Sequence, residues 1–319
     1  MENNLFRKIK LVNLKTEGTL VIILLVLGIG LNFATDRFFT AGNLSNLVRQ
    51  TSVSGIVALG MTFVIISGGI DLSVGSSVGF AGIYVAILMT RGVPVIWAVI
   101  IALAVSTAFG VLNGVLIFDG KVPPFIATLG TMTIVRGAIM LISGAKMVAG
   151  LPKPFLNFSQ NTFLMLPNLF VVWFILIVIS SFIASQTRFG RNVYTIGSST
   201  EVARLCGINI RSNTYLIYGL CAFLSAIAGI LMTSRLANGI PTGGQGYELE
   251  AIAACVVGGA SLNGAEGTII GTVLGAIIMA VIRNGGNLLG IDPFILQMVN
   301  GFLIIFAVLL DQLRKMRTK

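Results

Sequence analysis

The segment VIWAVIIALAVSTAFGVLNGVLIF, residues Val95–Phe118, contains no charged side chain. A transmembrane α-helix needs about 20 consecutive, mostly apolar residues to cross the hydrocarbon core of a bilayer. This segment is long enough by itself, so it predicts a membrane-spanning helix. The composition of the whole chain agrees, since 55% of its 319 residues are hydrophobic, only 10% are charged, and the mean hydropathy is +0.97. These values indicate a polytopic membrane protein.

Apolar segments of this kind recur along the chain, although several are shorter. The candidate spans are residues 20–34, 52–67, 74–89, 95–118, 125–142, 169–185, 214–234, 252–262, 268–282 and 294–310. The span at 252–262 should begin nearer Tyr247. Ten spans place both termini on one side of the membrane. Most of the 21 Lys and Arg residues then lie on that side, and such an excess marks the cytoplasm. We therefore predict an all-α fold of about ten transmembrane helices, with residues 1–319 forming a single domain and both termini cytoplasmic.

The formal net charge of +10 does not indicate nucleic-acid binding, because the basic residues lie in short loops and at the termini. The chain has no histidine, which excludes most zinc sites and Ser-His mechanisms. Its three cysteines form no CxxC pair, and Cys221 and Cys255 lie in apolar segments, as small buried side chains do. We expect no metal, no bound cofactor and no enzymatic activity in this chain.

A polar segment, TRFGRNVYTIGSSTEVARLCGINIRS, residues 187–212, separates two of the long apolar segments. It holds four arginines and one acidic residue, and the predicted topology places it in the cytoplasm. Ser198 and Glu201 fit the capping box that starts a helix, and Gly207 is suited to end it. Three apolar side chains then share one helix face, those of Val202, Leu205 and Cys206. Such a helix lies either on the membrane surface or in a groove of a soluble partner.

The residues GGIDLS, 68–73, interrupt two apolar segments with a double glycine, an acid and a serine. Glycine tolerates non-helical backbone, and Asp71 or Ser73 can cap the next helix. Two interpretations remain open at this point. The residues form either a tight cytoplasmic turn or a broken helix beside the translocation path, since irregular backbone in a membrane must line a cavity or be covered by protein.

Arg136 lies inside a predicted span, where a charge is costly unless it faces the bundle interior, a polar cavity or another charge. Glu248 and Glu250 at the start of another span are candidate partners, but they lie on different helix faces, so at most one can point at a given arginine. Both glutamates are alternatively exposed near the outer surface. The amides of Asn113 and Asn287 lie near span ends, where they suit sugar recognition or loop caps. Aromatic rings such as that of Tyr218 suit sugar stacking or an interfacial belt. The candidate translocation-path residues are Gly68, Gly69, Asp71, Ser73, Arg136, Glu248 and Asn287.

Short stretches over nearly the whole chain resemble, in the same order, the permease subunits of bacterial ABC importers for ribose, xylose and galactose. They are ALGMT (58–62), GGIDLSVG (68–75), FIATL (125–129), RFGRNVYTIG (188–197), ARLCGI (203–208), GYELEAIAA (246–254), GGASL (258–262) and NLLG (287–290). The outer loop, residues 146–166, shares little with this family. Because that loop should face a binding protein, the resemblance leaves the identity of the sugar open.

The resemblance implies a multi-pass protein of the bacterial cytoplasmic membrane that works with partners. These are a second permease copy, identical or not, a cytoplasmic ABC ATPase that binds ATP and Mg²⁺, and an extracytoplasmic sugar-binding protein. The chain itself has no GxxxxGK[ST] motif and hence no P-loop. The resemblance also implies that residues 187–212 are a coupling loop received by the ATPase. Its candidate coupling residues are Arg188, Gly190, Arg191, Gly197, Glu201, Ala203, Arg204 and Gly207.

We therefore predict a permease subunit that moves a monosaccharide into the cytoplasm by alternating access, with ribose as the leading candidate. Other small polar solutes remain alternatives within the same class, namely another pentose or hexose, a sugar-like signal or a branched-chain amino acid. A stand-alone transporter driven by protons or sodium is a second class. It should carry carboxylates within its spans, whereas Asp71, Glu248 and Glu250 all lie near predicted span ends.

Overall fold

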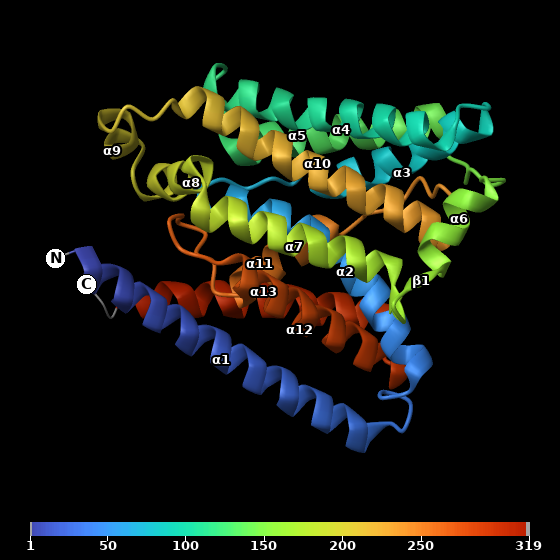
Figure 1. The fold of residues 1–319 in the computed structure, drawn as a ribbon, viewed down its shortest axis with the longest axis horizontal. Coiled ribbons are helices and arrows are strands. Elements are labelled where there is room, and N and C mark those ends of the chain that lie inside the picture. Colours follow the sequence, from blue (N-terminus) through green and yellow to red (C-terminus); the bar gives the residue numbers. More distant parts are fainter. Residues whose placement is uncertain (1, 317–319) are drawn as a thin grey trace.

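The computed structural model describes the backbone of residues 2–316 and the side chains of residues 17–306, 308 and 309. This described part folds into thirteen helices and one two-stranded hairpin (Figure 1). The helices are α1 (Glu2–Ala34), α2 (Ala41–Ile66), α3 (Val74–Thr90), α4 (Val95–Phe118), α5 (Pro124–Ser143), α6 (Lys153–Gln160), α7 (Asn168–Gln186), α8 (Arg188–Ser198), α9 (Thr200–Leu205), α10 (Ile210–Leu236), α11 (Tyr247–Val257), α12 (Ile269–Leu288) and α13 (Pro293–Met316). The antiparallel strands are β1 (Thr162–Phe163) and β2 (Leu166–Pro167).

Each of the ten apolar segments predicted from the sequence overlaps a helix, and α4 has the predicted bounds. Seven helices of the described part are long and apolar enough to cross a membrane. The other three helices that carry a predicted span are shorter, namely α3, α11 and the apolar part of α13. The chain is an all-α polytopic membrane protein.

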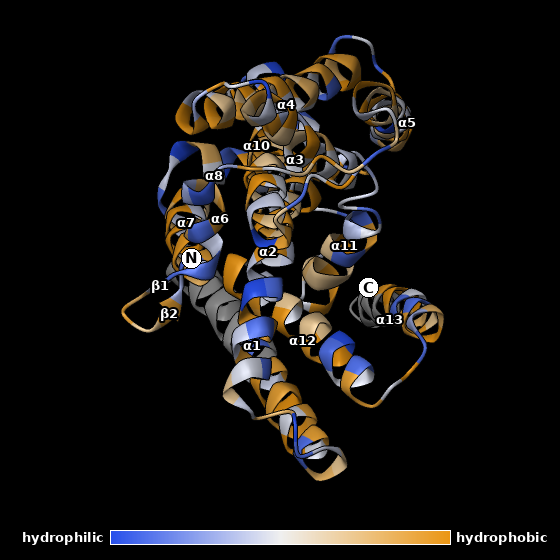
Figure 2. Cartoon of the chain, turned by 90° about the vertical axis from the view of Figure 1, so that its right-hand side faces the viewer, coloured by the Kyte–Doolittle hydropathy of each residue, from blue (hydrophilic) through white to orange (hydrophobic). Residues whose placement is uncertain are grey.

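Two long helices, α2 and α10, form the centre of the bundle. In α2 the 16 consecutive residues Thr51–Ile66 are all buried, as are most residues of α10. Helices α7, α10, α11 and α12 all pack against α2, and Figure 2 shows α2 between them. α4 and α3 pack against α10. Apolar residues of α1 are largely exposed, which suits a helix at the lipid-facing periphery.

The prediction was wrong about residues 252–262. The helix there begins at Tyr247, near the position expected, but it ends at Val257 because the chain turns at Gly258 and Gly259. An 11-residue helix rises about 16 Å, roughly half of the hydrocarbon core. Helix α11 is therefore a half-helix with irregular chain on both sides.

The first and last described turns of the chain, in α1 and α13, lie at the same end of the bundle as α8 and α9 (Figure 1). Helix α6 and the β1–β2 hairpin lie at the opposite end. This arrangement gives the bundle two chemically distinct ends. One end carries the basic α8–α9 segment, and the other carries the long connection between α5 and α7.

Candidate functional site

The irregular segment 67–73 lies inside the bundle. Figure 1 shows it running as an extended trace from the end of α2 to the start of α3. Asp71 is 0% exposed and Ser73 is 1% exposed, whereas Gly68 is exposed and has a φ of 81°, which favours glycine. A Cβ atom at Gly69 would clash with the Tyr218 hydroxyl, so a larger residue there would displace the buried Tyr218 ring. Most of the segment is thus irregular backbone that the protein covers, which differs from a tight turn exposed at the surface.

Buried polar side chains hold this segment in place. The Asp71 carboxylate accepts hydrogen bonds from the Ser73 backbone N–H at 2.8 Å and from the Ser73 hydroxyl at 2.6 Å. The Asn113 side-chain amide on α4 donates to the Ser73 hydroxyl oxygen at 2.9 Å, and the Thr131 hydroxyl on α5 donates to the Asn113 side-chain oxygen Oδ1 at 2.6 Å. Four buried side chains from three elements therefore form one chain of hydrogen bonds.

Two groups beside this chain have no hydrogen-bond partner among the described residues, the second carboxylate oxygen of Asp71 and the Tyr218 hydroxyl. Both are buried, so each carries a desolvation cost that a partner would relieve. An intramembrane carboxylate of this kind usually marks a functional position. Asp71 is therefore the member of this cluster with the strongest functional signal.

Helices α3 and α11 start close together in the bundle interior. A Cβ atom at Gly75, near the start of α3, would lie 2.0 Å from the Glu248 carboxylate and 2.5 Å from the Gly244 carbonyl oxygen. Arg136 of α5 reaches the same place and donates to the Gly243 carbonyl oxygen at 2.7 Å. The two helix starts therefore meet at glycine positions, beside one guanidinium and one carboxylate.

The hydrogen-bond partner of Arg136 is thus a backbone carbonyl, whereas the sequence suggested a glutamate. Among the described residues no ion pair within 4.0 Å joins Arg136 to either candidate glutamate, but Glu248 is close enough to interact electrostatically with the guanidinium. Glu250 instead lies 2.7 Å from the guanidinium of Arg283 on α12, a short contact that is misaligned for a hydrogen bond. Glu250 is 6% exposed, so the interpretation of both glutamates as exposed is also wrong. Asn287 lies exposed near the end of α12, and no contact joins it to the Asp71 cluster.

Residues 187–212 fold into two helices, of which only α9 was predicted. The N-cap of α9 is Ser199, one residue later than the predicted Ser198, and its side chain accepts from the Val202 N–H. Gly207, with a φ of 73°, follows the helix as expected. Val202 and Leu205 are 50% and 87% exposed, so most of the predicted apolar face of α9 is uncovered by the described chain.

The candidate coupling residues divide into two groups by burial. The charged ones are exposed, namely Arg188, Arg191, Glu201 and Arg204. Gly190 and Ala203 are buried, and Gly197 is half-buried where α8 meets the rest of the bundle. The α8–α9 segment therefore packs through its small residues and presents its charges and apolar side chains outward.

Gly197 lies at a crossing of three chain segments. A Cβ atom there would be 1.8 Å from the Ile66 carbonyl oxygen at the end of α2. That oxygen accepts a hydrogen bond at 2.8 Å from the N–H of Ala265 in the α11–α12 connection. Tyr194 of α8 donates to the Gly267 carbonyl oxygen at 2.8 Å, and burial raises the pKa of its phenol. The end of α8 thus contacts the segments that follow both α2 and α11.

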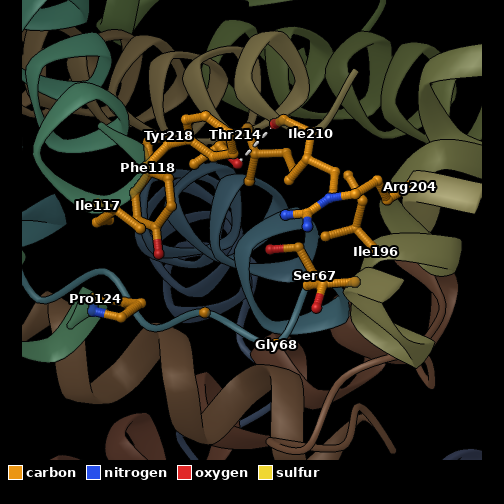
Figure 3. A pocket seen from close by; sticks show the side chains of 13 residues that line it. Ser67, Gly68, Ile117, Phe118, Pro124, Ile196, Arg204, Ile210, Thr214 and Tyr218 are labelled. Atoms are coloured by element: carbon orange, nitrogen blue, oxygen red, sulfur yellow. Dashed lines mark hydrogen bonds between the residues drawn. The ribbon is translucent and has the colours of Figure 1, made fainter. Parts of the chain in front are cut away.

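A cavity of about 340 Å³ lies between α9 and the bundle (Figure 3). Its wall is formed by the turn at 67–69, the end of α4, the starts of α5 and α10, and residues of α8 and α9. Figure 3 shows the Arg204 guanidinium directed over Ser67, with the Tyr218 ring on the far wall. The cavity therefore connects the exposed α9 with the turn that leads to Asp71.

Within the described chain, no group of three or more Cys, Asp and Glu residues is placed to hold a metal ion. Cys221 and Cys255 are buried, as the sequence indicates, and Cys206 is exposed. The polar residues that the fold gathers are hydroxyls, amides and isolated charges. They are suited to hydrogen bonding rather than to covalent chemistry.

The family model described as branched-chain amino acid transport system / permease component matches residues 43–308. The chain belongs to this permease family. It is 40% identical to the ribose import permease protein of Bacillus subtilis, over 91% of this chain and 90% of that protein. It is 39% identical to the ribose import permease protein of Escherichia coli K12, over 92% and 93%, and 36% identical to the galactose/methyl galactoside import permease of the same strain, over 95% and 96%. No solved structure matches the chain.

Sequence reasoning missed part of this site. It did not single out Thr131, because a polar residue in an apolar helix does not reveal its neighbours, and it placed Tyr218 only among the aromatic residues suited to sugar stacking. It noted Asn113 only as an amide near a span end. Helix α8 was also missed, although Val193 and Ile196 lie three residues apart and are both buried. That spacing was the available signal.

Proposed function

We propose that this chain is the transmembrane permease subunit of an ABC importer that moves a monosaccharide into the cytoplasm, with ribose as the leading candidate. The main support for this proposal is the similarity to the ribose import permeases over about nine-tenths of both chains. Similarity over such a length spans nearly the whole of both chains rather than one shared segment. The relative for galactose is less similar, at 36% identity, which supports ribose as the first cargo to test.

In this proposal the end of the bundle that carries α8 and α9 faces the cytoplasm, and so do both termini. The basic residues of α8 and α9 agree with that orientation. The three short helices count as spans because irregular chain extends them, which gives ten. The protein is then a multi-pass permease of the cytoplasmic membrane, in which the segment 67–73 returns into the bundle from the cytoplasmic side.

Helix α9 is proposed as the coupling helix. It combines an uncovered apolar face, Val202 and Leu205, with the exposed charges of Glu201 and Arg204. A short amphipathic helix of this kind fits a groove on a partner. Since the chain has no P-loop, ATP and Mg²⁺ would be bound by the ATPase partner. ATPase closure would push α9, and the contacts of α8 at Gly197 would carry that push to the ends of α2 and α11.

We propose that the bundle interior changes conformation when the ATPase displaces α9. The half-helices α3 and α11 start there, and discontinuous helices of this kind line the substrate sites of many transporters. A two-state bundle shifts only if the push favours one state over the other. A second permease copy would complete the path, and an extracytoplasmic binding protein would deliver the sugar to the end that carries α6.

The decisive experiment is uptake of radiolabelled ribose into proteoliposomes. The chain is reconstituted with the ATPase and binding protein encoded beside it, and parallel samples lack one component. We expect uptake only with both partners and ATP. Uptake by the chain alone under a proton or sodium gradient would contradict the proposal and indicate a secondary transporter. Galactose, xylose and leucine are competing cargoes in the same assay.

A further inference from the structure

The cavity behind α9 has the size and wall chemistry of a small-molecule site. Its volume of about 340 Å³ lies at the lower end of the range of roughly 300–1,000 Å³ that ligand pockets occupy. Polar groups reach it from both sides, Thr200 and Arg204 from α9 and Ser67 and Thr214 from the bundle. Within the described part of the chain, the Thr214 hydroxyl donates to the Ile210 carbonyl oxygen of its own helix, at 2.9 Å, and to no other group.

The charges around the cavity favour a neutral ligand over an ion. Among the residues that the structure describes, no Asp or Glu lines the cavity and Arg204 is the one charged side chain there; it is exposed, so an ion pair with it would be weak. Helices α5 and α10 begin at the cavity, whereas α2 and α4 end there. Their positive and negative ends therefore oppose one another. Donors and acceptors are both present, and the Phe118 and Tyr218 rings add apolar surface.

We propose that this cavity binds a neutral monosaccharide and that the bound sugar holds α9 against the bundle. The inference rests on the proposed function for its choice of ligand. A sugar that contacts Thr200 and Arg204 on one side and Ser67 and Thr214 on the other bridges the two parts. It binds best when α9 has the position seen here, so it opposes any displacement of α9. Sugar accumulated in the cytoplasm would thereby slow its own import.

Binding is tested on the purified permease in nanodiscs, without its partners. Thr200→Cys is introduced in a Cys206→Ser background, because Cys206 is the exposed native thiol while Cys221 and Cys255 are buried. D-ribose at about ten times its Kd should slow the reaction of this thiol with a small methanethiosulfonate about tenfold. Equal concentrations of mannitol serve as the osmotic control. An unchanged reaction rate at saturating ribose would overturn the proposal.

A matched pair of variants tests the contact itself. Thr214→Val removes a hydroxyl that lines the cavity, and Thr107→Val removes one with the same bonding, to the Leu103 carbonyl oxygen at 2.7 Å, elsewhere in the bundle. Ribose affinity is measured by saturation-transfer NMR. It should fall about fivefold in Thr214→Val, the effect of losing one net hydrogen bond, and stay unchanged in Thr107→Val. Equal affinities in the two variants would refute a sugar contact at this wall.

The regulatory part is tested on the assembled importer. Ribose added on the α9 side should reduce ATP hydrolysis, and Thr214→Val should raise the half-inhibitory ribose concentration about fivefold, in step with the binding result. Inhibition that is equal in Thr214→Val and Thr107→Val would contradict the proposal. If the importer takes up ribose but shows neither protection nor inhibition, the inner site is wrong and the proposed function stands. If it takes up another sugar, the function needs revision, and that sugar replaces ribose in these tests.

Discussion

Replacing Gly197 by alanine should loosen the junction between α8 and the bundle. The added Cβ atom would lie 1.8 Å from the Ile66 carbonyl oxygen, whereas such contacts are essentially never shorter than 3.0 Å. The two segments must therefore separate by at least 1.2 Å, the difference between these distances. That shift breaks the 2.8 Å hydrogen bond from Ala265 to Ile66. Overpacking and the lost bond together should cost about 2–4 kcal/mol of unfolding free energy.

Thermal unfolding in nanodiscs measures this cost. A thiol-reactive dye reports the exposure of Cys221 and Cys255, both 0% exposed in the fold, in a Cys206→Ser background. Gly130→Ala is the matched control, because Gly130 lies in α5 with no atom within 4 Å of the added Cβ. Alanine there should be neutral or gain about 0.5–1 kcal/mol. Equal unfolding temperatures for Gly197→Ala and Gly130→Ala would refute the reasoning, and transport coupling should fail only in Gly197→Ala.

Three other predictions concern the interior and α9. Asn113→Ala should cost about 1–3 kcal/mol, because it leaves the Ser73 and Thr131 hydroxyls without this partner, and the thiol assay should report earlier unfolding. Arg283→Met should cost about 3 kcal/mol by leaving Glu250 buried and unpaired, and the same assay should show recovery when Glu250→Leu is added; no recovery would contradict the ion pair. Leu205→Asp should leave stability unchanged, since Leu205 is 87% exposed, but abolish ribose-stimulated ATP hydrolysis, and wild-type stimulation would exclude α9 as the docking helix.

Much of the fold could be predicted because apolar length is a local signal. The segment 95–118 needs no tertiary information to be assigned as a helix, and α4 has those bounds. The start of α9 could similarly be predicted to within one residue from Ser198, and its end from Gly207. These signals depend on the backbone itself, so the rest of the fold does not change them.

The site was harder to predict because its members come from distant parts of the chain. The contact of Arg283 with Glu250 competes with the sequence expectation that a glutamate would pair with Arg136. Arg136 instead uses the backbone of Gly243, and a carbonyl acceptor leaves no trace in a sequence. The cavity behind α9 likewise depends on how six elements approach one another, which composition does not encode.

The shortness of α11 has a consequence for how the protein is made. A helix of about 16 Å, flanked by irregular chain, is a poor substrate for insertion by itself. Its polar backbone needs neighbours that are already in the bilayer, and the central helices α2 and α10 precede it in the chain. We expect α11 to enter the membrane late, as a hairpin with α12. Glycosylation mapping of nascent chains ended after α11 or after α12 tests this order, and stable insertion of α11 before α12 is synthesised would exclude it.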